Sequence, residues 1–308
     1  MNTLNNRLIC GTWQFSKPEK YGYDEEQIFE VIQEVMKHGV NYFDTSDNYG
    51  NGRSELFLKR AQVTNKKEVK IISKVGLTKN GRNGSADHIL NSIEKSLERL
   101  GRDYLDVYLL HWPDYQVGIE HSWETLLHLK EAKLVKEIGL SNVSHEEIER
   151  CHKIGFVDVV QNIYNPFSRG MEMDILPYCR LRKITVMGYG ALAHGYLRPN
   201  TEGSKRTIPN DWRKNLPLYK NENLDFQNAT QKISAICDEY GSPFYQAIID
   251  WITREEGVDY AIAGWRTKEQ VNEFFQYKNV REKDLLLNRI SEIVEGLPEG
   301  CKITNLTF

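Results

Sequence analysis

The chain has 308 residues, a formal net charge of -3 and 27% charged residues, which is the composition of an ordinary globular protein. This near balance of charge creates no field that would attract nucleic acid. The opening segment MNTLNNRLIC lacks the apolar core of a signal peptide, and no apolar run reaches the roughly 18 residues that span a membrane. We therefore expect a cytoplasmic protein with no membrane contact.

The cysteines argue against a disulfide framework and against a zinc cluster. Their number is odd, no pair has Cys-x-x-Cys spacing, and they are scattered through predicted elements. A reducing compartment fits this pattern best. The five are Cys10, Cys151, Cys179, Cys237 and Cys301.

Eight short apolar runs recur along the chain, and predicted helices separate most of them. Continuous runs of Val, Ile and Leu are typical of buried parallel strands, and their alternation with helices predicts βαβ units. Eight such units close naturally into a barrel, so we predict an α/β fold, a (β/α)8 TIM barrel, with residues 1–308 as a single domain. The predicted strands are Leu8–Gly11, Val40–Asp44, Val69–Lys74, Leu105–His111, Val135–Asn142, Val157–Asn162, Ile184–Tyr189 and Asp259–Gly264.

Segments between these strands carry apolar residues at i, i+3 and i+4, which predicts amphipathic helices. Two of them begin with a predicted capping box, formed by Ser144 with Glu147 and by Thr267 with Gln270. The helices predicted within the βα units are Asp24–His38, Gly52–Gln62, Ala86–Leu100, Trp123–Glu131, Ser144–Ile154, Met171–Leu181 and Thr267–Tyr277.

The stretch His194–Asp225 interrupts the alternation, because it is rich in Asn, Pro, Lys and Gly and has no apolar period. A structureless segment of this length is usually functional, so we interpret it as a long loop over the C-terminal mouth of the barrel that folds over a ligand. Helices are predicted after it at Phe226–Tyr240 and Pro243–Arg254, with an extra C-terminal helix at Lys283–Glu295. The tail Leu297–Phe308 is predicted to be irregular.

Four chemically active side chains follow predicted strands two, three and four. Asp44 and Tyr49 lie in NYFDTSDNYG, Lys74 ends VKIISK, and His111 ends LDVYLLH. The ends of these strands are neighbours on a barrel, so we expect the four side chains to converge. A metal hydrolase would need clustered ligands at several strand ends, and only Asp44 and His111 qualify, so no metal site is predicted.

Convergence would make Tyr49 a proton donor. A free phenol has a pKa of about 10, too high for an acid matched to neutral pH. A Lys74 ammonium about 4 Å away interacts with a phenolate by roughly 4 kcal/mol, which would lower the pKa of Tyr49 toward neutrality. Asp44 would keep that lysine charged, and His111 would orient a substrate oxygen.

Each of the four residues also has an ordinary structural interpretation. A tyrosine after a strand is usually a packing residue, and an aspartate there often caps a turn. A histidine at an apolar strand end is more often a core residue than a catalyst, and a lysine there is commonly a plain strand terminus. The joint occurrence of four mutually activating groups at one end of a barrel favours catalysis.

The sequence resembles the aldo-keto reductase superfamily over most of its length. FDTSDNYGNGRSE is similar to the family's segment with the catalytic aspartate and tyrosine, ISKVG to its lysine segment, and LLHWPD to its histidine segment. The resemblance implies that Tyr49 is the general acid, that Lys74 and Asp44 tune it, and that His111 orients the carbonyl. Trp13 and Trp112 match aromatic positions of the substrate pocket, which Tyr49 and His111 complete, although packing at the barrel rim would also explain two indoles.

The same resemblance implies a nicotinamide dinucleotide, because IGLSN and QNIYN are similar to the family's nicotinamide-binding strands. Ser141, Asn142 and Gln161 match residues that bind the carboxamide, and Tyr189 matches the aromatic residue that stacks on the ring. GYGALA approaches the Gly-rich fingerprint, but a polar loop follows it instead of a helix, so a Rossmann site is not expected. The predicted cofactor contacts are Gly11, Thr12, Trp13, Asp44, Ser141, Asn142, Gln161, Tyr189, Gly190, Leu192, Gly264, Arg266, Gln270 and Glu273.

Two cations, Arg266 and Lys268, flank the predicted helix N-cap Thr267. Cations at a helix N-terminus oppose the macrodipole, so a bound anion such as a 2'-phosphate would explain them better than two solvated side chains. The segment resembles the family's adenosine-phosphate motif, which implies Arg266 at the phosphate, Gln270 beside it and Glu273 at the adenine. We therefore expect NADP(H) in preference to NAD(H).

Together these features predict an NADP-dependent oxidoreductase that reduces an aldehyde or ketone to an alcohol, with a small-molecule carbonyl substrate. Two alternatives stay open. One is a sugar or alcohol dehydrogenase that uses the same residues in the oxidative direction. The other is a nucleotide-sensing regulatory subunit, similar to the β subunits of potassium channels. The identity of the substrate and the oligomeric state do not follow from the sequence.

Overall fold

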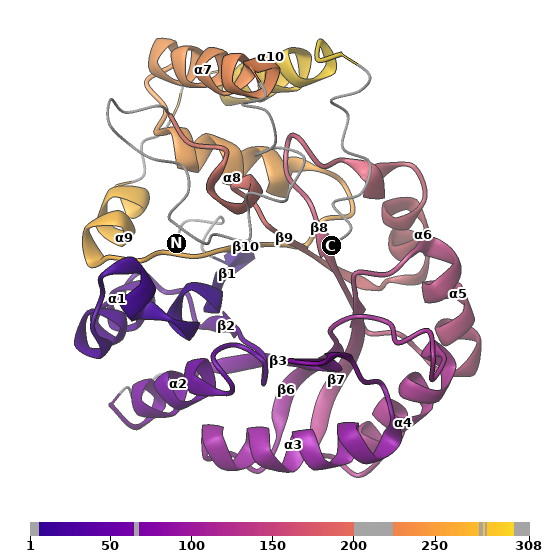
Figure 1. Cartoon of the computed structure of the whole chain (residues 1–308). Coiled ribbons are helices and arrows are strands. Elements are labelled where there is room, and N and C mark those ends of the chain that lie inside the picture. The colour runs from indigo at the N-terminus through magenta and orange to yellow at the C-terminus, as the bar shows by residue number, and fades with distance from the viewer. Residues whose placement is uncertain (1–5, 65–67, 200–223, 277–279, 281, 299–308) are drawn as a thin grey trace.

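The computed structural model describes residues 6–64, 68–199, 224–276, 280 and 282–298. In this part of the chain, eight parallel strands close into a barrel in the order β1-β10-β9-β8-β7-β6-β3-β2, and helices surround it (Figure 1). The predicted (β/α)8 barrel is confirmed. Its strands are β1 (Leu8–Gly11), β2 (Tyr42–Asp44), β3 (Lys70–Val75), β6 (Leu105–Leu110), β7 (Val135–Ser141), β8 (Val159–Ile163), β9 (Thr185–Tyr189) and β10 (Tyr260–Ala263).

The helices agree with the predicted ones apart from their ends. They are α1 (Glu25–Lys37), α2 (Arg53–Thr64), α3 (Ala86–Leu100), α4 (Ile119–Glu131), α5 (His145–Ile154), α6 (Ile175–Arg182), α7 (Leu224–Glu239), α8 (Phe244–Arg254), α9 (Lys268–Phe275) and α10 (Lys283–Glu295). Short 3-10 helices were not predicted: η2 (Trp13–Ser16), η3 (Pro18–Tyr21), η4 (Gly170–Glu172) and η5 (Ala193–Gly195). A small hairpin, β4 (Leu77–Thr78) with β5 (Gly81–Arg82), was also not predicted.

Two helix boundaries differ from the sequence prediction for identifiable reasons. Helix α4 begins at Ile119, four residues earlier than expected, because Gly118 makes the turn with a φ of 88° and Ile119 enters the core. The helix expected from Met171 divides into η4 and α6, because the side chain of Asp174 accepts a hydrogen bond from the Ile175 backbone N–H and starts a new helix there.

Of the two predicted capping boxes, one is complete. At α5, Ser144 and Glu147 exchange both hydrogen bonds. At α9, Thr267 accepts from the Gln270 backbone N–H, but the Gln270 side chain accepts from the backbone N–H of Arg266 instead. The side chain of Gln270 therefore holds the residue before the cap in place.

Strand periodicity explains how the barrel presents its polar residues. Apolar side chains of adjacent strands fill its interior, as in other barrels of this type. Side chains two positions further along a strand lie on the same face, so this face continues into the residues at the carboxyl ends. The interior cluster consists of Ile9, Ile72, Val107, Leu109, Val159, Met187 and Ile262. Two positions beyond its members lie Gly11, Lys74, His111, Gln161, Tyr189 and Gly264.

The close approach of strands inside the barrel requires one glycine. A Cβ atom at Gly139 of β7 would lie 2.2 Å from the carbonyl oxygen of Val159 and 2.8 Å from Cδ2 of Leu109. Gly139 therefore keeps β7 against its neighbour β8 and places Ser141, two residues on, at the end of the barrel.

The long loop predicted at His194–Asp225 is only partly covered by the structure. Residues 200–223 lie outside the described part, so the expected cover over the mouth is not tested. At the two ends the prediction is wrong, because His194 belongs to η5, and Leu224 and Asp225 already belong to α7. Of the predicted irregular tail, residues 299–308 also lie outside the described part.

The extra C-terminal helix α10 is confirmed, and it lies beside α7 on the outside of the barrel (Figure 1). Arg289 of α10 forms an ion pair of 2.8 Å with Glu239 of α7, and Trp251 of α8 donates to Ser291 of α10 at 2.9 Å. Over the described ranges, no helix combines the length and the apolarity needed to cross a bilayer. The four cysteines there are buried and unpaired: Cys10, Cys151, Cys179 and Cys237.

Candidate active site

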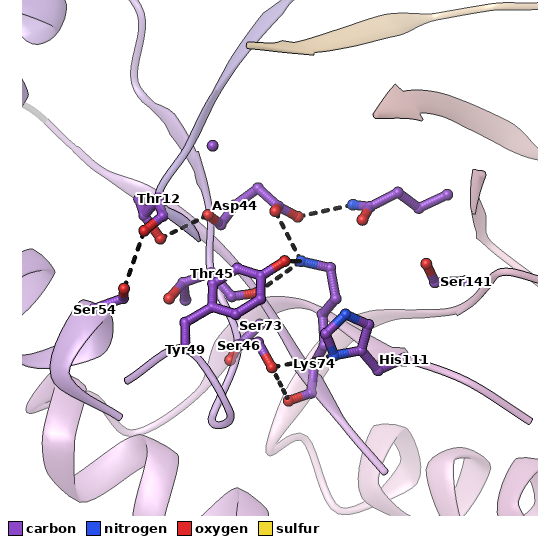
Figure 2. A network of polar contacts seen from close by, with 12 residues as sticks. Thr12, Asp44, Thr45, Ser46, Tyr49, Ser54, Ser73, Lys74, His111 and Ser141 are labelled. Atoms are coloured by element: carbon purple, nitrogen blue, oxygen red, sulfur yellow. Dashed lines mark hydrogen bonds and ion pairs between the residues drawn. The ribbon is translucent and has the colours of Figure 1, made fainter. Parts of the chain in front are cut away.

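The predicted chemical residues meet at one end of the barrel, at or just past the carboxyl ends of the strands. Asp44 ends β2, Lys74 lies near the end of β3, and Tyr49 lies in the loop after β2. His111 directly follows β6, and its backbone N–H continues the ladder by donating to Val75 at 2.8 Å. The four side chains that the sequence placed far apart therefore converge (Figure 2).

Lys74 is the centre of this arrangement, and its side chain is 1% exposed. Its Nζ atom lies 2.7 Å from Oδ1 of Asp44 and 2.8 Å from the carbonyl oxygen of Thr45. The same atom lies 3.5 Å from the hydroxyl oxygen of Tyr49 (Figure 2). The ammonium group thus connects the carboxylate to the phenol.

The pKa values differ from the sequence expectation. Burial raises the pKa of Tyr49 well above its usual value, and the charge of Asp44 raises it further. Burial also lowers the pKa of Lys74, against the opposing effect of Asp44. The expected fall in the tyrosine pKa is therefore not found, because burial removes the hydration that a phenolate needs and the Asp44 charge acts in the same direction. Tyr49 keeps its proton.

Asp44 is held from two sides. Its Oδ1 atom accepts from Lys74, and its Oδ2 atom accepts from Nε2 of Gln161 in β8 at 2.8 Å. The backbone oxygen of Asp44 accepts from both the backbone N–H and the hydroxyl of Thr12, each at 2.9 Å. The carboxylate therefore has a fixed position opposite the ammonium.

His111 lies beside Tyr49, with the two rings edge to face and 5.8 Å between their centroids. Burial, together with the nearby charge of Lys74, lowers the pKa of His111 well below its usual value. The imidazole is therefore neutral at physiological pH. Its Nδ1 atom lies 3.3 Å from the hydroxyl oxygen of Ser46, a residue that the sequence analysis did not single out, although it lies between Asp44 and Tyr49 in DTSDNYG.

A group of amide and hydroxyl side chains lies at the ends of β7 and β9. Asn142 donates to the carbonyl oxygen of His111 at 2.9 Å and to Oγ of Ser141 at 3.0 Å. The hydroxyl of Tyr189 donates to Oδ1 of Asn142 at 2.6 Å. Asn142 adopts a left-handed conformation with a φ of 59°, which turns its side chain toward these partners. Gly190 follows Tyr189 with a φ of 69°.

The predicted phosphate-binding residues lie around the first turn of α9, beside the end of β1. Arg266 and Lys268 flank the N-cap Thr267, and Nζ of Lys268 lies 3.9 Å from Oε2 of Glu34. The ends of β1 and β10 are joined by Gln14, which donates to the carbonyl oxygens of Gly11 and Trp265 at 2.8 and 3.0 Å. A Cβ atom at Gly264 would lie 2.6 Å from the Gln14 amide, so a side chain there would displace that amide from its present position.

The remaining predicted contacts are more scattered. Gln270 and Glu273 are exposed on α9, and Leu192 precedes η5. Trp13 begins η2 and is 38% exposed. Trp112 is partly buried.

The hairpin that the sequence analysis missed contributes a cation to Trp112. Arg82 of β5 lies over the Trp112 ring at 5.0 Å and over the ring of Tyr115 at 5.3 Å. This contact supports the alternative interpretation of Trp112 as a residue that packs at the rim of the barrel.

Comparisons with known proteins show which family the chain belongs to. The model of the Aldo/keto reductase family matches residues 7–295, nearly the whole chain. The chain belongs to the aldo/keto reductase family. An aldo-keto reductase of Bacillus subtilis is 30% identical over 274 residues, which covers 86% of this chain and 83% of that protein. An NADH-specific methylglyoxal reductase of Escherichia coli is 28% identical over 313 residues and covers 95% of each chain.

Among solved structures, a glycerol dehydrogenase from Gluconobacter oxydans superposes with a TM-score of 0.83. It is 25% identical and covers 95% of this chain and 93% of its own. This aldo/keto reductase is thus an oxidoreductase on a TIM barrel. Where the structure describes side chains, no three His, Cys, Asp or Glu residues are grouped as metal ligands in this reductase.

Proposed function

We propose that this aldo/keto reductase reduces an aldehyde or ketone to an alcohol with NADPH, and that Tyr49 is the general acid. The observation that carries the proposal is the contact of 3.5 Å between the Lys74 ammonium and the Tyr49 hydroxyl, with Asp44 at 2.7 Å on the other side. A buried ammonium in this position has no need of the phenol for its own stability, because Asp44 and the Thr45 carbonyl already bind it.

The residues present fit a nicotinamide dinucleotide phosphate. Amide and hydroxyl groups of Ser141, Asn142 and Gln161 lie together at the ends of β7 and β8 and would hold a carboxamide. Tyr189, which Asn142 fixes at 2.6 Å, would flank the ring. Arg266 and Lys268 at the start of α9 would bind a 2'-phosphate. When bound, the cofactor supplies a hydride to the carbonyl carbon.

The side chains of this chain then handle the proton. The substrate oxygen accepts hydrogen bonds from the hydroxyl of Tyr49 and from His111, which orient the carbonyl. As negative charge develops on that oxygen, Tyr49 transfers its proton to it. The phenolate that remains is stabilised by the ammonium of Lys74. The raised pKa of Tyr49 keeps the proton in place until the substrate oxygen becomes basic enough to take it.

The reverse reaction is a second candidate, because the same groups would take a proton from an alcohol. The similarity to a glycerol dehydrogenase with a TM-score of 0.83 supports this direction. Two observations point to different cofactors. The relative from Escherichia coli is NADH-specific, whereas Arg266 and Lys268 favour the 2'-phosphate of NADPH. Turnover measured in both directions, and titration with NADPH and with NADH, would separate these cases. Equal affinity for both cofactors would contradict the NADP preference.

The mechanism is tested by Tyr49→Phe, which removes the acid and keeps the ring. NADPH binding, followed by nicotinamide fluorescence, should stay at the wild-type level. Turnover of a panel of aldehydes and ketones should fall by roughly 10²–10⁴-fold, the usual contribution of a general acid. Turnover of Tyr49→Phe equal to wild type would refute the mechanism. Tight NADPH binding without any turnover by the wild type would instead favour a nucleotide sensor.

A further inference from the structure

Glu34 brings a carboxylate close to the residues proposed to bind the 2'-phosphate. It belongs to α1, which lies beside α9 on the outside of the barrel (Figure 1). Its Oε2 atom lies 3.9 Å from Nζ of Lys268, the first residue of α9, and its side chain is 11% exposed. Among the residues that the structure describes, Glu34 is the one carboxylate in contact with Lys268.

The packing of the two helices fixes this neighbourhood. The ring of His38 on α1 stacks on the ring of Phe275 on α9, with 4.4 Å between the centroids and 6° between the planes. Nε2 of His38 also lies 3.3 Å from Oδ1 of Asn272. Because these contacts hold α1 against α9, Glu34 stays beside the first turn of α9.

Glu34 carries its negative charge near neutral pH. The hydrogen bond from Nζ of Lys37, at 3.0 Å, lowers the pKa of Glu34, and the charges of Lys37 and Lys268 lower it further, against the opposing effect of burial. The side chain is therefore a carboxylate that attracts the Lys268 ammonium.

This attraction affects the two cofactors differently. In the proposed function, Lys268 binds the 2'-phosphate, which NADPH carries and NADH lacks. An ammonium group that already contacts a carboxylate gains less from a second anion, because it must leave or share its first partner. The contact with Glu34 therefore weakens the binding of NADPH and leaves that of NADH unaffected.

We propose that Glu34 lowers the preference of this reductase for NADPH over NADH, because it competes with the 2'-phosphate for the Lys268 ammonium. The inference rests on the proposed function, which places the 2'-phosphate at Lys268. Glu34 is thus a residue that determines cofactor specificity from outside the cofactor site. Its effect is limited to a few-fold, since the Lys268 side chain is 42% exposed and solvent screens the pair.

The test is the dissociation constant of NADPH and of NADH, measured by quenching of tryptophan fluorescence at low ionic strength and without substrate. Glu34→Gln removes the charge and keeps the shape of the side chain. It should bind NADPH about threefold more tightly than wild type and NADH equally well. An unchanged affinity for NADPH would overturn the inference.

Glu26→Gln is the matched control, because it removes the same charge from the same helix. Glu26 pairs with Arg60 at 2.7 Å instead of with Lys268, and both side chains of that pair are exposed. The control should leave both dissociation constants at the wild-type level. An equal gain in NADPH affinity in Glu26→Gln would overturn the inference, since net charge alone would then explain the effect.

A second pair of variants tests whether Glu34 acts through Lys268. Lys268→Met should weaken NADPH binding and leave NADH binding unchanged. In this background, Glu34→Gln should no longer change the affinity for NADPH. A gain of the same size with and without Lys268 would overturn the inference, because Glu34 would then repel the phosphate directly. If Glu34→Gln does not fold, Glu34→Asp, whose shorter side chain withdraws the carboxylate from Lys268, should change NADPH affinity in the same direction.

The outcomes separate this inference from the proposed function. Full NADPH affinity in Lys268→Met would refute the 2'-phosphate site of the proposed function. Weakened NADPH binding in Lys268→Met, together with wild-type affinity in Glu34→Gln, would refute only the role of Glu34.

Discussion

Two ion pairs, Asp44–Lys74 and Glu55–Arg99, lie on opposite sides of the strand β3. They differ in whether all of their contacts are made with groups that serve packing. Ser73 and Lys74 are neighbours in β3, so their side chains point to opposite faces. On the outer face, Glu55 of α2 accepts from Ser73 at 2.7 Å and pairs with Arg99 of α3 at 2.6 Å. Arg99 also donates to Ser96 at 3.1 Å. All these partners belong to the packing between the barrel and its helices.

On the inner face, Lys74 pairs with Asp44, and its third contact is the hydroxyl of Tyr49. That hydroxyl lies at the carboxyl end of the barrel, where the active sites of such folds lie. The remaining contacts of the outer pair are with Ser73 and Ser96, which belong to the packing. The inner pair, in contrast, contacts the Tyr49 hydroxyl, a group able to exchange a proton with a ligand. Under the proposed mechanism, the outer ion pair stabilises the packing of the helices on the barrel, and the inner ion pair supports proton transfer.

The largest effect is expected when the inner pair is broken. Lys74→Met keeps the length of the side chain and removes the ammonium that stabilises the phenolate in the proposed mechanism, so kcat should fall by roughly 10²–10⁴-fold. Asp44 is then a buried charge without its cation, which also destabilises the fold. The double variant Lys74→Met with Asp44→Asn should recover stability in urea unfolding and stay inactive. Recovery of activity in the double variant would contradict the assignment of reactivity to this pair.

The outer pair should affect stability instead. Glu55 is fully buried and the Arg99 side chain is 23% exposed, so Glu55→Ala leaves a mostly buried cation and should lower the free energy of unfolding by about 3 kcal/mol. Its kcat should stay near wild type in the folded protein. Arg53→Ala is the control, since its ion pair with Glu19 is exposed and should contribute less than about 1 kcal/mol. Equal loss of stability in both variants would remove the distinction between buried and surface pairs.

The smallest effect concerns Asp47, which lies between the two pairs. Burial and, to a smaller extent, the Glu55 charge together raise its pKa to about 6. For an acid whose pKa is raised by folding, the stabilising contribution is present below the unfolded value and is lost as the pH rises through about 6. Glu55→Gln should lower the pKa of Asp47, which a 13C titration of the carboxyl group would measure. An unchanged midpoint of the Asp47 titration would show that the Glu55 charge does not affect the loop after β2.

Much of this arrangement was predictable from particular residues. The apolar runs ending in Asp44, Lys74 and His111 predicted the barrel and the convergence, because strand periodicity and barrel closure follow from the pattern alone. Ser46 was missed, because a serine in a polar loop carries no signal until its neighbour His111 is known. The hairpin with Arg82 was missed for a similar reason, since strands of two residues are too short to show a period.

The amino-acid sequence alone determined the order of strands and helices, the four side chains that we propose to carry the reaction, and the end of the barrel at which they meet. Only the tertiary structure decided their electrostatics. Burial reversed the expected direction of the Tyr49 pKa and keeps the His111 ring neutral. Folding also brought Gln161 and Thr12 within hydrogen-bonding distance of Asp44. The physical reason is that hydration and hydrogen bonding depend on which atoms lie within a few ångströms, and folding brings together residues that the sequence keeps far apart.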